Sequence, residues 1–472
     1  MAKAATTTVS DALQAAAEHH AAGQLDDAER LCDAVLAALP DHAEALHRRG
    51  ILAFQRGALD HAADFVRRAI AVDENAPEPR NSLGNILLAG GNYADAVACY
   101  RDSLSVGPDA PVTLINLGIA LYGAGGRDDA KEALGDGLAL MPEHAQARAA
   151  LAVIALDEGE DGDAAAQLRA AALLQPRYGY GASCVLGEDL DAYTDVSGID
   201  EMLTAAPALE GEMPAGAQPG PVSGPVVVTS CDHGYFRRYA RPLAASLDAN
   251  APGHDLHIHV FNPEPDFDSE LDALRTSLVN TTVTASREVA PGADAVYFSN
   301  MRFVRLHQIM QACGRGLVSL DADSLVRFPL GGLGGATGAA LGAADLSVTL
   351  RRDRAEIGQK WLATTLVLRD TEAVRDYLSR VACYVLNCFH EDRLVWYLDQ
   401  CVLYLVHRMM ERAGVAPTLA PLAPGYADTT FAPESAIWAA KGDRKTAPAF
   451  VAEAASYAIP LARPGQAGRR TA

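Results

Sequence analysis

The sequence predicts a chain with two different folded parts, an all-α solenoid of helical repeats followed by an α/β domain with a largely parallel sheet. Three observations lead to this prediction. Small residues recur every 34 positions in the first part of the chain, β-branched runs alternate with helical patterns after residue 225, and a segment rich in Pro, Gly and Ala separates the two regions. A length of 472 residues leaves room for several domains.

The repeat period is carried by small residues and by proline. Glycine and alanine each return at a step of 34 residues, and proline closes four of the five units. Apolar residues recur at helical spacing on both sides of a Gly-rich turn, so we expect two helices in each unit. The series are Gly23, Gly57, Gly91, Gly125 and Gly159; Ala28, Ala62, Ala96, Ala130 and Ala164; and Pro40, Pro108, Pro142 and Pro176.

This combination of Gly, Ala and Pro within a 34-residue unit resembles the tetratricopeptide repeat. Five repeats over residues 9–176 would stack into a solenoid with a concave face. The resemblance implies a docking surface for a partner, here a protein or glycan acceptor. The same array could instead form a homodimer contact or pack against the following domain, and the sequence leaves these interpretations open.

The remaining domain boundaries follow from changes in composition. Residues 1–8 are predicted to be an N-terminal tail, and residues 177–224 a capping segment and linker, because Pro, Gly and Ala are frequent there. Residues 225–448 hold the α/β pattern, and residues 449–472 are predicted to be a C-terminal tail.

The composition argues against several kinds of partner and location. A formal net charge of −21 would repel nucleic acid, so no such partner is expected. Eight cysteines without a Cys-x-x-Cys pair are typical of a reducing compartment. The chain opens without a signal-peptide pattern and lacks an apolar run of about 18 residues, so we expect a cytoplasmic protein without a transmembrane segment.

The α/β region contains short apolar runs separated by helical patterns. In such a sheet, ligands bind beyond the carboxyl ends of the strands. Two polar segments occupy those ends, one after the first expected strand and one, with Asp321 and Asp323, after a later strand. Strands are expected at 226–229, 254–262 and 316–320, and a helix at 300–313.

The two aspartates and a later basic cluster suggest a site for a metal ion and a diphosphate. Carboxylate oxygens at Asp321 and Asp323 suit Mg²⁺ or Mn²⁺, which are hard ions. The ion would bridge a diphosphate and neutralise its charge. Lys441, Arg444 and Lys445 could clamp the same phosphates. A turn cap is the alternative for the aspartates, and a solvated charge cluster is the alternative for the cations.

The α/β region resembles a GT-A glycosyltransferase, closest to the family 8 type, in short segments that occur in the right order. Asp232 and Tyr235, which follow Thr229 and Ser230, are similar to the Asp-x-x-Tyr that holds the nucleoside in that family. For Asp232 a helix N-cap is an equal alternative. Arg305, in an Arg-Leu pair, resembles the arginine that faces the donor, and a surface ion pair is an equal alternative for it.

Later segments extend this resemblance toward the metal and the donor sugar. The segment with Asp321 and Asp323 resembles the metal-binding Asp-x-Asp of the family. Asp399 and Gln400 resemble an Asp-Gln pair beside the donor sugar, which implies a role in catalysis. The resemblance assigns neither of this pair as a nucleophile.

The last segment matches the family only in part. Lys441, Gly442 and Lys445 lie in a stretch similar to His-x-x-Gly-x-x-Lys, of which Gly442 and Lys445 are matched residues. Ala439 stands where the family has its histidine, the third metal ligand. The family's Phe-Asn-Ala-Gly is also missing, because Leu362 and Thr364 replace its Asn and Gly.

The resemblance implies an enzyme, a hexosyltransferase that depends on Mn²⁺ or Mg²⁺. By resemblance, it would move a sugar with retention from a nucleotide-sugar, a UDP-sugar, to an acceptor recruited by the repeats. The alternative is a non-catalytic scaffold with a degenerate transferase domain, which the missing histidine favours. A third hypothesis is the repeat-fused protein O-glycosyltransferase, but that enzyme uses two Rossmann domains and no metal.

Overall fold

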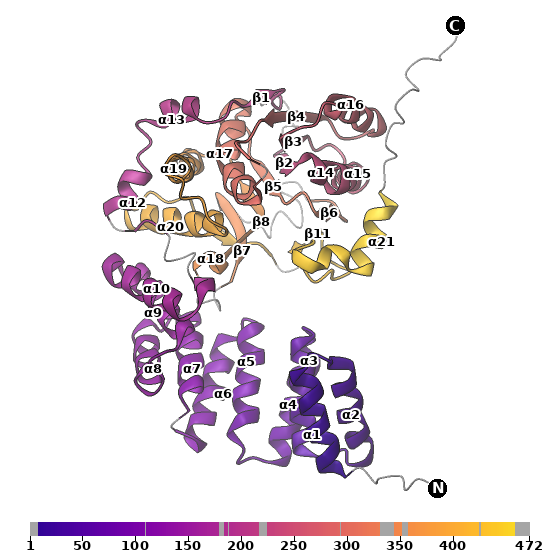
Figure 1. Cartoon of the computed structure of the whole chain (residues 1–472), viewed down its shortest axis with the longest axis vertical. Coiled ribbons are helices and arrows are strands. Elements are labelled where there is room, and N and C mark those ends of the chain that lie inside the picture. Colours follow the sequence, from indigo (N-terminus) through magenta and orange to yellow (C-terminus); the bar gives the residue numbers. More distant parts are fainter. Residues whose placement is uncertain are drawn as a thin grey trace. The chain divides into compact units, whose positions relative to one another are not determined.

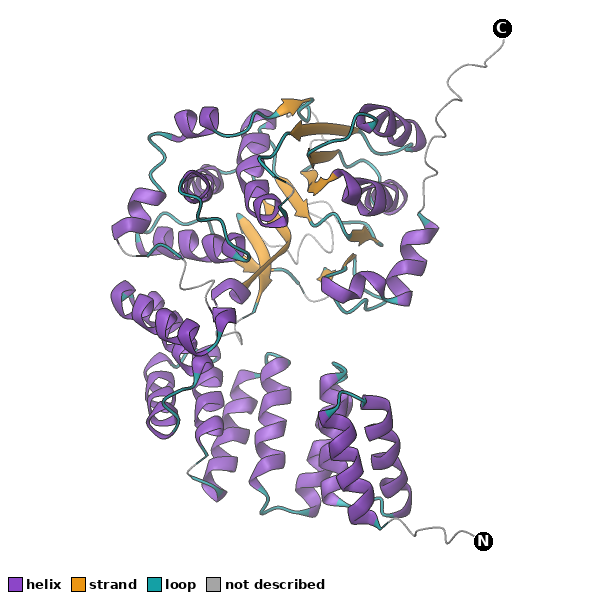
Figure 2. Ribbon diagram, viewed as in Figure 1, coloured by secondary structure: helices purple, strands orange, loops and turns teal. Residues whose placement is uncertain are grey.

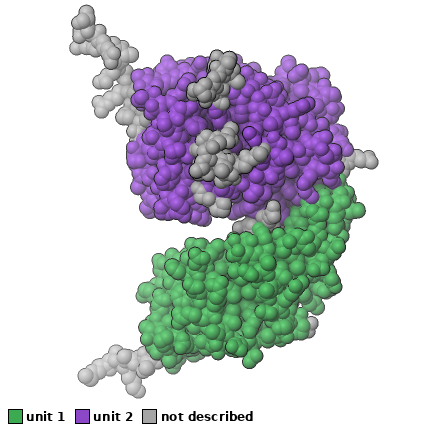
Figure 3. Space-filling view, turned by 180° about the vertical axis from the view of Figure 1, so that it is seen from behind, with its two compact units in different colours: residues 1–179, 352–356 green, residues 180–351, 357–472 purple. Residues whose placement is uncertain are grey.

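The computed structural model divides into two compact units, one built from the N-terminal helical pairs and the other containing the described strands (Figure 3). Each unit is considered by itself below. The structure describes residues 8–108, 110–178, 184–186, 188–216, 224–292, 294–330, 344–351, 357–423 and 426–457. Among the described helices, none has the length and apolar character needed to cross a membrane.

The described part of the first unit is helical, with antiparallel pairs that repeat along the chain (Figures 1 and 2). The prediction of two helices per unit is confirmed. The helices are α1 (Val9–Ala21), α2 (Leu25–Ala38), α3 (Ala43–Gln55), α4 (Leu59–Val72), α5 (Pro77–Ala89), α6 (Tyr93–Val106), α7 (Pro111–Gly123), α8 (Arg127–Leu140), α9 (Ala145–Glu158) and α10 (Asp161–Leu174).

The repeated small residues explain this packing. The alanine series of the repeat is fully buried in every unit, because each methyl lies at a helix contact. The glycine series forms the turn within each pair with a left-handed backbone, as in Gly125 at φ 93°. A second glycine allows close approach, since a Cβ on Gly84 would lie 2.5 Å from the ring of Tyr100.

The segment expected to cap the repeats contains short elements, of which η1 (Pro176–Tyr178) packs on α10 and the later ones belong to the second unit. Its described part also includes α12 (Glu188–Tyr193) and α13 (Ile199–Ala205). Both α12 and α13 contact α19 (Glu372–His390), a helix of the second unit. The stretch after residue 187 is therefore attached to the α/β unit by packing.

The second unit is built on a mixed sheet with the strand order β1-β4-β3-β2-β5-β8-β7-β9. The four strands β4, β3, β2 and β5 are parallel, whereas β8 runs antiparallel to β5 and to β7. The prediction of a largely parallel sheet therefore holds for this central part only. The strands are β1 (Glu210–Gly211), β2 (Val226–Asp232), β3 (Leu256–Phe261), β4 (Val283–Glu288), β5 (Leu317–Leu320), β7 (Leu346–Leu350), β8 (Trp361–Leu368) and β9 (Leu419–Pro421).

Helices cover both faces of this sheet (Figure 1). On one face, Leu247 of α15 (Arg241–Asn250) and Leu271 of α16 (Phe267–Ser277) belong to the same hydrophobic core as Ile258 of β3. On the other face, Phe261 of β3 packs with α13, α17 and α19. The helices beside those already named are α14 (His233–Tyr235), the π-helix η2 (Phe236–Ala240), α17 (Ala295–Cys313), α18 (Ile357–Lys360), α20 (Leu398–Arg412), η3 (Gly442–Thr446) and α21 (Pro448–Ser456).

A small second sheet joins the end of the chain to the loop after β5. Its strands are β6 (Ser324–Val326), β10 (Ala427–Asp428) and β11 (Ile437–Ala439), in the order β10-β11-β6. The N–H of Ala440 also donates to the carbonyl of Asp323 at 3.0 Å. This pairing places the basic segment after β11 beside the aspartates that follow β5.

Candidate functional site

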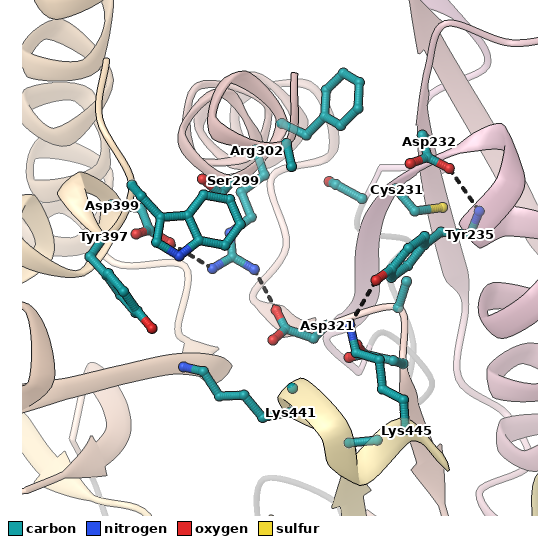
Figure 4. A pocket seen from close by; sticks show the side chains of 18 of the residues that line it. Cys231, Asp232, Tyr235, Ser299, Arg302, Asp321, Tyr397, Asp399, Lys441 and Lys445 are labelled. Atoms are coloured by element: carbon teal, nitrogen blue, oxygen red, sulfur yellow. Dashed lines mark hydrogen bonds and ion pairs between the residues drawn. The ribbon is translucent and has the colours of Figure 1, made fainter. Parts of the chain in front are cut away.

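The candidate site lies at the topological switch point of the sheet, where the order of the parallel strands reverses. The chain moves from β2 to β3 and β4 on one side and then returns to β5 on the other side of β2. At such a switch point the loops after two neighbouring strands separate and leave a crevice. A cavity of about 470 Å³ occupies this place, with walls from the ends of both strands (Figure 4).

The cavity brings together most of the residues predicted from the sequence. Segments that are far apart in the chain contribute to it, including the loops after β2 and β5, the first turn of α20 and the segment after β11. Arg302, Trp396 and Tyr397 also line it, and the sequence did not single them out. The predicted residues in its lining are Ser230, Asp232, Tyr235, Asp321, Asp323, Asp399, Gln400, Lys441, Gly442 and Lys445.

Two predicted residues, Thr229 and Arg305, lie outside the cavity lining, and the structure corrects both expectations. Thr229 is a buried residue within β2. Arg305 is completely buried in an ion pair with Glu288 of β4, and it also donates to the carbonyl of Pro207 at 2.9 Å. The pairing with Glu288 turns Arg305 toward the sheet, so its guanidinium holds α17 and the segment after α13 together.

Arg302, one helical turn earlier, lines the cavity instead of Arg305. Its guanidinium lies between two carboxylates, with an ion pair to Asp321 and a 3.0 Å hydrogen bond to Asp399 (Figure 4). Ala295, Phe298, Ser299 and Arg302 all line the cavity from α17. That spacing of three, four and seven residues defines one helix face, and it is the sequence signal that could have identified Arg302.

Lys445 forms the second link between a cation and the aspartates. Its Nζ lies 2.7 Å from a carboxylate oxygen of Asp323 and donates to the hydroxyl of Tyr235 at 2.7 Å. Lys441 points into the cavity (Figure 4), with its Nζ 5.9 Å from the ring centre of Tyr397. By contrast, Arg444 turns away from the cavity and bonds to Thr429.

Burial and like charge change the acidity of the cavity side chains. Burial, together with the neighbouring Asp321 carboxylate, raises the pKa of Asp323 to about 6. Burial also raises the pKa of Asp399 and lowers the pKa of Lys441. Perturbed groups of both signs in one cavity are a feature of functional sites.

The first turn of α20 is positioned by an unusual backbone. Tyr397, just before the helix, has a left-handed conformation with φ 65°. The first helical turn then directs Asp399 and Gln400 into the cavity. With its amide nitrogen turned toward the carbonyls, Gln400 donates to Trp361 at 2.9 Å and to Gly358 at 3.3 Å.

Asp232 combines the two roles that the sequence left open. Its carboxylate forms the N-cap of α14, where it accepts the N–H of Tyr235 at 2.8 Å. The same residue also lines the cavity. A capping role therefore does not remove Asp232 from the candidate site.

The donor set of the cavity fits a divalent ion that is shared with phosphates. Mg²⁺ is often held by one or two carboxylates and completes its shell with water and phosphate oxygens, and Asp321 and Asp323 supply two. Both carboxylates are paired with cations of this chain, so an ion must compete for them. Ala439, where the sequence resemblance would require a third ligand, is a buried residue of β11 without a donor atom in its side chain.

A group with possible metal ligands also occurs outside the cavity lining. Within the described part of the chain, ligand atoms of His233, Asp266 and Glu270 lie within 4.8 Å of one another. The Nδ1 of His233 accepts the N–H of Glu264 at 2.8 Å, and its Nε2 lies 3.1 Å from Glu270. Both ring nitrogens are thus engaged, which indicates a structural role for this histidine.

Comparisons with known proteins identify the first unit. A family profile for the tetratricopeptide repeat matches residues 13–79 and 115–181. The N-terminal helices are tetratricopeptide repeats. Tetratricopeptide repeat protein 7B of Homo sapiens is 35% identical over 78 residues, which are 16% of this chain and only 9% of the length of that protein.

Solved structures also resemble part of this chain. TTC0263, a thermophilic repeat protein of Thermus thermophilus, is 22% identical with a TM-score of 0.33, over 37% of this chain and 98% of its own. MamA from Desulfovibrio magneticus RS-1 is 17% identical with a TM-score of 0.33, over 36% of this chain and 96% of its own.

Proposed function

We propose that the second unit is a metal-dependent glycosyltransferase domain of the GT-A type, and that the tetratricopeptide repeats recruit the acceptor. The observation that supports this proposal is the convergence in one cavity. The aspartate pair, the Asp-Gln pair and the basic segment are far apart in the chain, yet all of them line the crevice at the switch point. The family resemblance assigns these segments to one donor site.

In this proposal the cavity side chains divide into a metal-binding and a phosphate-binding group. Asp321 and Asp323 hold Mg²⁺ or Mn²⁺, which would neutralise negative charge on a departing nucleoside diphosphate. Lys441 and Lys445 donate to the phosphate oxygens, and fixed donors of this kind stabilise developing charge without reorganisation. Arg302 keeps Asp321 and Asp399 in place before the ligands bind.

The remaining lining residues would contact the nucleoside and the sugar. Asp232 and Tyr235 lie at the end of β2, where the family resemblance places the nucleoside. Asp399 and Gln400 would lie beside the donor sugar. Gln400 is oriented by two backbone carbonyls and Asp399 by the guanidinium of Arg302, so both side chains are held before a donor arrives.

A binding module without catalysis is a second candidate, and two features favour it. Ala439 provides no third ligand for a metal ion, and Leu362 and Thr364 are buried in β8 where the family has polar contacts. In that case the repeats would be the working part of the chain, and the cavity would sense a nucleotide or a sugar.

Calorimetric titration of UDP and GDP, each with and without Mn²⁺, tests the proposal. We expect binding of a nucleotide that requires Mn²⁺ and that weakens at least about tenfold in Asp323→Ala, because a metal ligand is lost. Asp64→Ala, which removes an exposed carboxylate from the first unit, is the matched control and should bind as the wild type does. If neither nucleotide binds under any condition, the transferase proposal is wrong.

Hydrolysis of a UDP-sugar separates the two candidates once nucleotide binding is established. The enzyme should release the free sugar slowly in the presence of Mn²⁺, and Asp399→Asn should slow the release. Nucleotide binding without any release of sugar would favour the binding module.

A further inference from the structure

A second cavity of about 300 Å³ lies next to the candidate donor cavity, and Lys445 lines both of them. One wall consists of η2 and the first turn of α15, and the other wall is α21. The two walls belong to the same unit and are in contact, because Tyr239 and Phe450 share a small hydrophobic core.

The first wall carries an excess of positive charge. Arg237, Arg238 and Arg241 line the cavity from this wall, and Lys445 lines it from η3. No aspartate or glutamate is among the described residues of the lining. This arrangement is notable in a chain with a net charge of −21. A small cavity with cations on one wall and no acid in its lining favours an anionic ligand.

Arg237 and Lys445 form ion pairs with neighbouring acids. Arg237 pairs with three carboxylates on the loop before α16 and on α16 itself, and Lys445 pairs with Asp323. Arg238 adds an exposed charge, with its guanidinium 5.1 Å from the ring centre of Tyr239. This side chain can therefore turn toward a ligand without leaving a buried partner behind.

Arg241 has an uncommon environment for an arginine. It is 2% exposed, and burial lowers the pKa of its guanidinium, while the carboxylate of Glu270 acts in the opposite direction. An arginine keeps its charge in proteins even so. An anion in the cavity would add to the stabilisation of this buried charge, since hydrogen bonds from a guanidinium to phosphate oxygens are among the stronger ones.

The backbone of this wall also departs from a regular helix. The N–H of Arg241 bonds to the carbonyl of Phe236 across five residues, and η2 is a π-helix. Such single turns interrupt α-helices at a cost and occur frequently at functional sites. Here the turn carries Arg237, Arg238 and Tyr239, which line the cavity.

The opposite wall is apolar. Phe450, Val451, Ala454 and Ala455 face the cavity from α21, and Val451 remains 50% exposed. A ligand that fits both walls has an anionic end for the arginines and an apolar part for α21. We propose that this cavity binds a phosphate monoester that carries an apolar group.

This inference goes beyond the proposed transferase function and does not depend on it. The cavity would bind its ligand in the absence of any nucleotide or metal. Because Lys445 lines both cavities, the phosphate of the ligand would lie next to the site proposed for the donor. The two proposals can therefore fail separately.

Calorimetric titration of the full-length protein in EDTA with hexyl phosphate, inorganic phosphate and 1-hexanol tests the inference. We expect hexyl phosphate to bind at least about tenfold more tightly than either of the other two, because only this probe contacts both walls. Equal binding of hexanol, or equal binding of inorganic phosphate, would overturn the proposal.

Two variants at exposed positions locate the site without endangering the fold. Arg238→Gln should weaken hexyl phosphate binding about tenfold, through loss of a charged donor. Val451→Asp should weaken it by a similar factor, because a carboxylate would replace part of the apolar wall. Arg67→Gln removes an exposed arginine from the first unit and is the control. Unchanged binding in both Arg238→Gln and Val451→Asp would show that the ligand binds elsewhere.

Discussion

Arg302→Ala is the most informative perturbation of the candidate site. The guanidinium of Arg302 connects Asp321 with Asp399, and the side chains of Arg302 and Asp399 are only 17% and 5% exposed. Removal of one partner from a buried ion pair costs about 3–5 kcal/mol, because the other charge stays buried and unpaired. We expect a loss of about 3 kcal/mol, at the lower end of that range, because Asp321 is still partly in contact with solvent.

Thermal unfolding followed by circular dichroism measures this loss. With an unfolding entropy of about 2.1 cal/mol/K per residue, a unit of this size loses about 2 °C per kcal/mol, so the α/β unit should melt about 5 °C lower. The transition of the repeats provides an internal reference, since Arg302 belongs to the second unit. A sum of two transitions must be fitted, because two units need not unfold together.

A double-mutant cycle decides whether the unpaired charge is the cause. Asp399→Asn in the Arg302→Ala background removes the buried carboxylate, so the double variant should regain about half of the lost stability. If the loss of side-chain packing around Arg302 were the cause, Asp399→Asn should instead lower the stability further. A destabilisation below about 0.5 kcal/mol in Arg302→Ala would refute the electrostatic reasoning, since that is the scale of an exposed ion pair.

Three further predictions concern the cavity and the repeats. Because the pKa of Asp323 is raised to about 6, its carboxylate takes up a proton as the pH falls below that value, and Mn²⁺ affinity measured by calorimetry should be about tenfold lower at pH 5 than at pH 7. Lys445→Ala frees Asp323 of its cation, so Mn²⁺ alone should bind more tightly while nucleotide in the presence of Mn²⁺ binds more weakly; a change of both in the same direction would contradict the assignment of Lys445. In the repeats, Gly84→Ala should lower stability by about 1–3 kcal/mol in urea unfolding, because the new methyl overlaps the ring of Tyr100, whereas Gly135→Ala, a helical glycine with open space around it, should raise stability by about 0.5–1 kcal/mol.

The repeats could be predicted in detail because each one needs small residues at the same positions, so that their packing produces a period of 34 residues in the sequence. Each unit places alanine at a helix contact and glycine at a left-handed turn, as Ala130 and Gly125 show. These requirements are local and the same in every unit. The strands β2, β3 and β5 were also predictable, since short β-branched and apolar runs of that length usually form strands in an α/β domain.

The antiparallel part of the sheet was not predicted, for a physical reason. Every residue of β8 (Trp361–Leu368) is buried, so the strand shows no alternation that would separate it from a buried helix. Its partner β7 (Leu346–Leu350) has only five residues. The direction of β8 depends on which strand it joins, and that choice is made by packing in three dimensions.

The choice between Arg302 and Arg305 shows the same limit within the site. Both arginines precede the aspartates on one helix, and the resemblance selected Arg305. Its burial depends on Glu288, a residue of β4 that comes 17 positions earlier and lies on the neighbouring layer. A sequence motif shows that an arginine is present. Which carboxylate pairs with this arginine depends on how α17 packs on the sheet.

The charges of the cavity are arranged so that ligands can exchange partners with them. Asp321 and Asp323 are each paired with a cation of the same chain, Arg302 and Lys445, which avoids unpaired buried charge before any ligand is present. On the proposed function, a divalent ion would take over the two carboxylates while the diphosphate takes over Lys445 and Lys441. When both ligands bind, the number of paired charges stays the same. When one ligand binds alone, it separates these ion pairs and leaves charges of the chain without partners, so neither ligand alone should bind well. Binding of metal and nucleotide should therefore be mutually dependent, and this coupling, more than the strength of either interaction, would select a nucleotide together with its metal.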